Sequence, residues 1–291
     1  MTDWEDPSSP VAAEWERVVR GSYLVRQRFR YDYPASVRDL RHRLVILPPE
    51  RFGDQRRVLH DVRVSEPAEM RVFEDRFGNT VLEFRAARVA AAIEFEARIA
   101  VERHASGQPR PVQPAWLEDP ALLRPTRLTR PTRRLAGVAR QLAAGGATGL
   151  DLASAVNGWV HGALVYRGGT DVTTTAAQAL ARGGGVCQDY AHVMVALCRT
   201  LGLRALYVSG HLMGEGGTHA WVEVVLPHGA GAAAWAFDPT LGTRCDMRHL
   251  TVAVGRDYRD VAPTSGVYSG PPGGRLTARK RVDVTSLELA A

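Results

Sequence analysis

The sequence has few of the residues that hold small secreted domains together or carry a chain through a membrane. Its 291 residues include 3 cysteines, a single lysine (Lys280) and 7% aromatic residues. No apolar run approaches the roughly 20 residues of a membrane helix, and the N-terminal segment is acidic and polar, unlike a secretory signal. Three cysteines without paired spacing predict neither a disulfide framework nor a metal cluster. We therefore predict reduced thiols, a cytoplasmic location, no bound metal and no membrane partner.

Basic residues outnumber acidic ones, 37 to 31, for a net charge of +6. The arginines are scattered along alternating segments or concentrated between residues 105 and 134, and no helical segment combines a basic face with interleaved aromatics. Nucleic-acid binding needs such a concentrated basic surface. The charge is interpreted as solvated surface, and no nucleic-acid partner is expected.

Residues 20–104 predict an N-terminal β domain, because apolar and polar residues alternate there with a period of two. In the segment 58–65, valines and a histidine occupy one face while polar residues occupy most of the other. The tripeptide at 77–79, FGN, predicts a turn between two such segments. Repeated strands joined by turns favour an all-β sandwich.

The next two regions predict a linker and a second domain. Residues 105–134 carry six prolines and a repeated RPTR, which is typical of a stiff spacer. In residues 135–291, helical spacing comes first and strand-like segments follow at 204–212, 218–226 and 232–240, with a last one near the C-terminus. Helices followed by an antiparallel set of strands predict an α+β fold.

Cys187 follows three glycines in GGGVCQDYAHVMVALC, residues 183–198, and begins a helical pattern. At a first helical turn, unpaired N–H groups and the helix dipole stabilise a thiolate, so a nucleophile is one interpretation. A buried core thiol is the other, and it explains Cys198, three turns further along. His192 is turned by about 140° from Cys187 on this helix and cannot serve as its base.

His219 begins an alternating segment, HAWVEV, and Asp238 lies in AFDPT, with which the next segment ends. If residues 227–230 form a four-residue hairpin loop, Leu226 pairs with Gly231 and His219 lies opposite Asp238. The carboxylate would then hold one tautomer of the imidazole and leave its other nitrogen for a thiol. A surface pair, or a bulge that shifts the register, is the alternative.

The segments that contain these three residues, with YDYPASVRDLRHRLVILPP near the N-terminus and HLTVAVGRDYRDVAP at 249–263, resemble the bacterial transglutaminase-like proteins of the papain-like superfamily. The resemblance implies a papain-like core in which a helix-start cysteine packs on an antiparallel sheet. It also implies a triad of Cys187, His219 and Asp238 and no cofactor.

The resemblance implies less about the surroundings of the triad. Papain-like enzymes place a glutamine six residues before the cysteine, where this chain has Ala181, so the second oxyanion donor is open. Tyr166 is similar to an aromatic residue near the site of relatives, or is a helical core residue. Trp221 either lines the substrate cleft or is a packing residue. Gln188 is either a substrate-binding or oxyanion residue or a residue that holds the local backbone.

The expected activity is hydrolysis of peptide or isopeptide amides through a thioester, with a peptide or protein as substrate. Two alternatives stay open: transfer of a glutamine γ-glutamyl group to an amine, and peptide binding without turnover. The β domain is expected to pack against the catalytic domain and shape its cleft.

Overall fold

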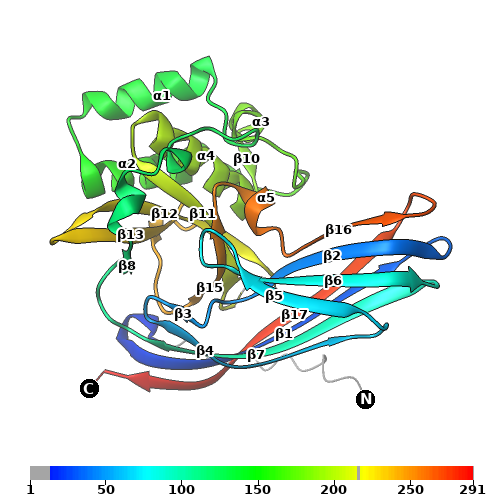
Figure 1. The fold of residues 1–291 in the computed structure, drawn as a ribbon. Coiled ribbons are helices and arrows are strands. Elements are labelled where there is room, and N and C mark those ends of the chain that lie inside the picture. Colours follow the sequence, from blue (N-terminus) through cyan, green and yellow to red (C-terminus); the bar gives the residue numbers. More distant parts are fainter. Residues whose placement is uncertain (1–13, 215–216, 291) are drawn as a thin grey trace.

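The computed structural model describes residues 14–214 and 217–290, which form a β sandwich with an α+β domain stacked on it (Figure 1). The predicted fold class is confirmed: antiparallel β sheets come first, and helices packed on an antiparallel sheet follow. Each helix among the described residues is too short or too polar to cross a bilayer.

The β sandwich consists of two antiparallel sheets with a shared core. One has the strand order β17-β1-β7-β4-β3 and the other β16-β2-β6-β5. Alternate residues of β1 point inward, among them Tyr23, Val25 and Phe29, as the period of two requires. The expected turn at 77–79 joins β5 to β6. The strands of the first half of the chain are β1 (Val18–Asp32), β2 (Val37–Leu47), β3 (Arg51–Phe52), β4 (Gln55–Val64), β5 (Glu69–Glu74), β6 (Thr80–Val89) and β7 (Ala92–His104).

The C-terminal strands belong to the sandwich, so the expected second domain of residues 135–291 is too long. Strand β16 (Thr264–Ser269) pairs with β2, and β17 (Arg275–Leu289) pairs with β1 along almost its whole length. The alternation in this segment predicts a strand but not its partner, which lies about 250 residues earlier in the chain. The chain therefore leaves the sandwich and returns to it.

The proline-rich segment 105–134 is not a free spacer. Strand β8 (Arg110–Val112) adds to the edge of the second domain's sheet, and two 3-10 helices, η2 (Pro114–Leu117) and η3 (Pro120–Leu122), follow it. The Arg110 guanidinium pairs with Glu223 and lies over the Phe52 ring, 4.0 Å from its centroid. The prolines occupy positions that donate no ladder bond, so the segment packs although its composition is that of a linker.

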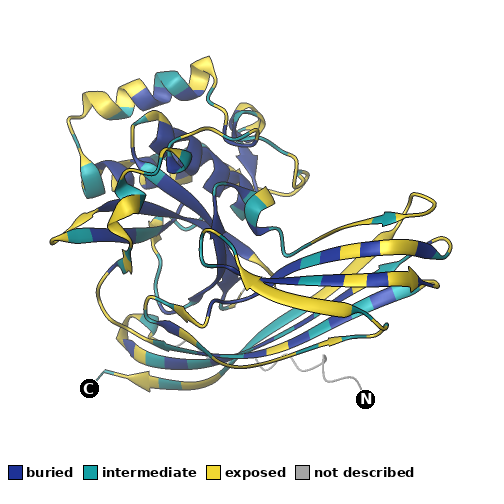
Figure 2. Ribbon diagram, in the orientation of Figure 1, coloured by how far each residue is buried: buried dark blue, intermediate teal, exposed yellow. Residues whose placement is uncertain are grey.

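The second domain packs helices against a sheet of order β14-β13-β12-β11-β15, with β8 beside β13. Helix α4 is buried on almost every side, and Figure 2 shows it in dark blue between the other helices and the sheet. A helix that is apolar all round is a core helix. The elements are α1 (Arg133–Ala144), α2 (Gly149–Ala163), β9 (Val165–Tyr166), α3 (Ala176–Arg182), β10 (Gly184–Gly185), α4 (Cys187–Thr200), β11 (Arg204–Leu212), β12 (His219–His228), β13 (Gly231–Asp238), β14 (Thr243–Arg244), β15 (His249–Gly255) and α5 (Tyr258–Val261).

Amide side chains of the sandwich pair with the outer edge of β15. The Gln55 amide accepts from the Thr251 N–H at 2.9 Å and donates to the Thr251 carbonyl at 2.8 Å. Asn79 makes the same pair of bonds with Val254, at 2.8 and 2.7 Å. These side chains satisfy backbone groups that an edge strand otherwise leaves exposed, so the sandwich fixes the position of β15.

Candidate active site

Cys187 is the first residue of helix α4, as the sequence predicts, and its side chain is half-buried. The preceding Val186 N–H donates to Asp189 Oδ2 at 2.9 Å, and the Thr170 hydroxyl donates to the same oxygen at 2.6 Å. The carboxylate in the first turn thus holds the start of the helix rigidly. Cys187 thus lies at the N-terminal end of α4, where backbone N–H groups and the helix dipole favour a negative charge.

The three glycines before Cys187 have separate structural reasons. Gly183 ends α3 in the left-handed conformation, with φ of 65°. A Cβ on Gly184 would lie 2.5 Å from the Val165 carbonyl, and one on Gly185 would lie 2.4 Å from the Asp189 carboxylate. The glycines let β10 pack beside β9 and let Asp189 reach back under the helix start.

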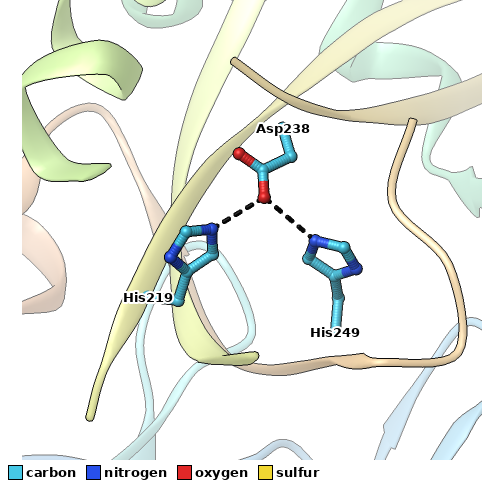
Figure 3. Close-up of side chains that lie close together, drawn as sticks. All are labelled: His219, Asp238 and His249. Carbon is cyan, nitrogen blue, oxygen red and sulfur yellow. Dashed lines mark hydrogen bonds and ion pairs between the residues drawn. The ribbon is translucent and has the colours of Figure 1, made fainter. Parts of the chain in front are cut away.

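His219 begins β12 and Asp238 ends β13, and their side chains are hydrogen-bonded. The distance from His219 Nε2 to Asp238 Oδ2 is 2.7 Å, and both side chains are fully buried. Because Nε2 faces Asp238, Nδ1 is the nitrogen on the other side of the ring (Figure 3). Burial opposes the charged imidazole, but hydrogen bonds to Asp238 and Cys187 outweigh it and raise the pKa of His219 to about 9. The structure thus brings Cys187, His219 and Asp238 together.

The predicted hairpin register is wrong, although the predicted contact is present. Leu226 pairs with Ala233 instead of Gly231, because both strands continue to a tight turn at 229–230. Gly229 adopts φ of 55° in that turn. The shift moves the pairing by two residues, so side chains keep their faces, and His219 reaches Asp238 as a diagonal neighbour.

Asp238 is held at both oxygens. Oδ1 accepts the N–H groups of Thr240 at 2.8 Å and Leu241 at 3.2 Å in the turn after β13. Oδ2 accepts from His219 and, at 3.1 Å, from His249 Nε2. Burial favours the neutral acid, but the bonds to the two imidazoles outweigh it and hold the pKa of Asp238 well below its usual range. The group is a fixed, buried carboxylate anion.

The sequence patterns do not predict His249 as a residue of the site. It is the first residue of β15, is almost fully buried, and its ring meets the same carboxylate oxygen as the His219 ring (Figure 3). A side-chain hydrogen bond joins it to Cys245 in the preceding turn. Five side chains therefore form one row, Cys187, His219, Asp238, His249 and Cys245, which we call the polar row. The sequence feature that could have indicated its role is a histidine at the start of the segment 249–255, as at the start of the segment that contains His219.

The three further predicted residues have distinct surroundings. Gln188 donates to the Asp171 carbonyl at 3.0 Å, so it ties down the loop before α3. The buried Trp221 ring packs against both row histidines, with centroid distances of 6.1 Å to His219 and 5.2 Å to His249. Tyr166 is not in a helical core: it lies on β9, pairs with Gly185 and is 55% exposed. Only Tyr166 lies at the surface.

The other buried histidines of this domain are structural. His192 accepts the Tyr258 N–H at 3.2 Å, and burial lowers its pKa to about 3. His211 bonds to the Gly217 carbonyl at 3.3 Å, and burial lowers its pKa to about 4. Cys198 is fully buried, as predicted, and burial raises its pKa to about 12. None of these side chains belongs to the polar row.

Among the described residues, one cluster has atoms close enough for a metal ion: His219, Asp238 and His249. Both imidazole Nε2 atoms face the same carboxylate oxygen, at 2.7 and 3.1 Å, which is hydrogen-bond geometry. In addition, His249 Nδ1 bonds Asp246, and a side-chain hydrogen bond links His219 to Cys187. Hydrogen bonds within the polar row therefore account for the positions of these nitrogen and oxygen atoms.

A cavity of about 640 Å³ lies between the two domains and reaches the outer end of the row. The sandwich lines it with Phe52, Gln55 and Arg103, and the second domain with Cys245 and His249.

Comparison with family models matches both parts of the chain. The model of the bacterial transglutaminase-like N-terminal region matches residues 23–102, and that of the transglutaminase-like superfamily matches residues 136–239. The second match contains Cys187, His219 and Asp238, the three residues whose side chains meet in the structure. The chain belongs to the transglutaminase-like superfamily.

Two mycobacterial proteins are among the relatives of this chain. The protein is 34% identical over 160 residues to the uncharacterized protein ML0607 of Mycobacterium leprae, covering 51% of this chain and 55% of that one. It is 38% identical over 117 residues to the uncharacterized protein Rv2569c of Mycobacterium tuberculosis, covering 36% and 37%. The chain thus spans about half, or less, of the length of these relatives.

A solved structure shares the transglutaminase-like fold of both domains. It is described as a "putative cysteine protease" from Cytophaga hutchinsonii, with a TM-score of 0.74, 18% identity and 93% coverage of each chain. At this identity the likeness shows the fold alone. His249 and Cys245 lie beyond the matched core segment, which ends at residue 239.

Proposed function

We propose that the protein is a cysteine-dependent hydrolase that cleaves peptide or isopeptide amide bonds through a thioester. The observation that carries the proposal is the hydrogen-bonded series from the helix-start Cys187 through His219 to a buried Asp238. Nucleophile, base and orienting carboxylate in that order are the arrangement that acyl transfer requires.

The proposed reaction begins with transfer of the Cys187 proton to His219 Nδ1. The sulfur attacks the amide carbonyl carbon, the S–C bond forms, and the C–N bond breaks as His219 Nδ1 gives its proton to the leaving amine. Water then attacks the thioester with His219 as base, which releases the acid and restores the thiol. Asp238 accepts from Nε2 throughout and stabilises each imidazolium state.

The start of α4 supports stabilisation of the oxyanion. The Cys187 N–H lies at the N-terminus of α4, where backbone donors and the helix dipole favour negative charge. Tyr166 lies on β9 beside β10, the strand that leads into Cys187. We assign Tyr166 to the substrate side of the site, while Gln188 and Trp221 support the backbone and the imidazole from behind.

Hydrolysis is favoured over amine transfer by the open surroundings of β9. Val165 and Tyr166 are 65% and 55% exposed, so solvent reaches the strand next to the helix start. An acyl-enzyme at such a surface meets water at far higher concentration than any amine. Transfer of a γ-glutamyl group is the second candidate, because it uses the same acyl-enzyme.

The test is incubation of the purified protein with a peptide library in H₂¹⁸O, with and without butylamine as an acceptor. The butylamine concentration is about 10 mM, well below the effective molarities that active sites achieve. We expect peptide acids that carry one ¹⁸O, and no products with a Cys187→Ala variant. Butylamide products that outnumber acids would replace hydrolysis by transfer. Equal product from wild type and variant, or none from either, would contradict the proposal and favour a peptide-binding scaffold.

A further inference from the structure

His249 binds the same carboxylate oxygen as the proposed catalytic base. The distance from its Nε2 to Asp238 Oδ2 is 3.1 Å, against 2.7 Å for His219 Nε2, and the two rings reach this oxygen from different strands, β15 and β12 (Figure 3). Its side chain is 2% exposed. Of the three side chains of the proposed triad, the one to which His249 is hydrogen-bonded is Asp238.

The surroundings of His249 keep a proton on Nε2 in both charge states. Its Nδ1 lies 3.1 Å from the Asp246 N–H and 3.2 Å from Asp246 Oδ1. When the ring is neutral, Nδ1 accepts from the Asp246 N–H, so the proton is on Nε2. When it is charged, Nδ1 donates to the Asp246 carboxylate and Nε2 is still protonated. Asp238 therefore accepts a hydrogen bond from the His249 Nε2–H in either charge state of the ring.

Charged and titratable groups face His249 from several elements. Asp238 comes from β13, Asp246 and Cys245 from the turn before β15, and Arg103 from β7 of the sandwich. Burial opposes a charge on His249, but Cys245 and the bonds to the two carboxylates outweigh it and raise its pKa well above the usual value.

The sandwich holds His249 in place. Arg103 donates from one nitrogen to the carbonyls of Asp246 at 2.7 Å and His249 at 2.6 Å, while its other nitrogen bonds Asp54. Two residues further along β15, the Gln55 amide pairs with both backbone groups of Thr251. The backbone that carries His249 is therefore fixed by the first domain.

We propose that His249 is a positioning residue for the reaction. Its Nε2–H holds Asp238 Oδ2 in the orientation that binds His219, and through it the β sandwich sets the geometry of the catalytic centre. This inference rests on the proposed function, since Asp238 orients a catalytic imidazole only if Cys187 is a nucleophile. It gives the N-terminal domain a defined part in the reaction, distinct from shaping the cleft.

Two amide substitutions separate positioning from packing. In His249→Gln, the amide nitrogen occupies about the place of Nε2 and can donate to Asp238. In His249→Asn, the shorter side chain places its nitrogen near the position of Nδ1, so the bond to Asp238 is lost. Both variants bury a neutral amide in the same site. His211→Leu is the matched control, because His211 pairs with the neighbouring Leu250 and has no contact with Asp238.

The experiment measures kcat and KM together with the iodoacetamide alkylation rate of Cys187 against pH. We expect kcat of His249→Asn to fall about 10- to 100-fold with KM unchanged, since a misoriented base costs on this order. Alkylation of this variant should begin at a higher pH than in wild type. His249→Gln should lie within about 3-fold of wild type, a neutral donor still being present, and His211→Leu should match wild type.

The proposal is overturned if folded Asn and Gln variants lose the same activity, or if both keep wild-type kcat and alkylation profiles. A loss in KM alone would also overturn it, because His249 would then act on substrate binding. Alkylation needs no substrate, so these outcomes differ from failure of the proposed function, in which wild type and Cys187→Ala give equal turnover. If His249→Asn does not fold, the Gln variant decides alone: a fall in its kcat of more than 10-fold contradicts the proposal.

Discussion

The two ends of the polar row look alike but differ in what surrounds each thiol. On both sides of Asp238 a histidine is bonded to the carboxylate, and on both sides a cysteine is bonded to that histidine. Cys187 begins a 14-residue helix, whereas Cys245 lies in the turn between β14 and β15. The order of residue types is therefore the same from either end.

The difference lies in the backbone that carries each thiol. The first turn of α4 directs N–H groups toward Cys187, and no such helix begins at Cys245, where burial raises the thiol pKa. The outer histidine is also bonded to a second carboxylate, that of Asp246. A cysteine, a histidine and an aspartate in contact are thus insufficient, and the helix start distinguishes the proposed nucleophile Cys187 from the turn thiol Cys245.

Replacing the centre of the row should have the largest effect. Asp238→Asn removes the anion from both histidines, and we expect kcat to fall by about 10³- to 10⁴-fold, as for other triads with a neutral third member. Asp246→Asn is the control, since it changes the bonds to the outer histidine and to Arg248 but leaves the Asp238 carboxylate in place, and it should cost far less. Equal losses in kcat for the two variants would show that the two ends do not differ as described.

A fall in pH should change the stability contribution of the buried histidines outside the row and that of the row histidine His219 in opposite directions. His42, His192 and His211 have pKa values lowered by burial to about 4, 3 and 4, so they are neutral in the folded protein. Their contribution to stability is complete above pH 6.5 and is lost as the pH falls below it. We expect each to cost about 2 kcal/mol of unfolding free energy between pH 7 and pH 5.

Urea unfolding at both pH values measures this loss, and His211→Leu should remove about 2 kcal/mol of it. The same pH dependence in the variant would contradict the assignment. His219 has the opposite sign: its pKa is raised to about 9, so its contribution is present below pH 6.5 and is lost as the pH rises through 9.

The smallest effect should come from the outer thiol. Cys245→Ala leaves both bonds of Asp238 Oδ2 intact, because Cys245 touches His249 and not the carboxylate. We expect kcat within about 3-fold of wild type, in keeping with the loss of one weak S–H bond. Steady-state kinetics beside the inactive Cys187→Ala checks this, and a loss above 10-fold would give Cys245 a role in the reaction.

Local patterns in the sequence predict the inner half of the row well. The glycine-rich entry to a helix places Cys187, and alternation places His219 and Asp238 on the same face of adjacent strands. The contact is present despite the wrong register, because a shift by two residues preserves the faces of both strands.

Pairings that are distant in sequence could not be predicted in this way. The alternation of residues 275–289 indicates a strand but carries no information that β1 is its partner. His249 begins a strand like His219, yet its neighbour Asp238 is brought to it by the sheet and by side chains of the sandwich. The outer half of the row depends on these tertiary contacts.

The most direct measurement is the alkylation rate of Cys187 and Cys245 by iodoacetamide, followed from pH 4 to pH 10 in one sample by peptide mass spectrometry, a range that spans the free-thiol pKa of about 8.5. We predict fast labelling of Cys187 well below that pKa, lost in His219→Ala, and slow labelling of Cys245 throughout. If Cys187 reacts only near the free-thiol pKa in both proteins, or if Cys245 is the faster thiol, the account of the site is wrong.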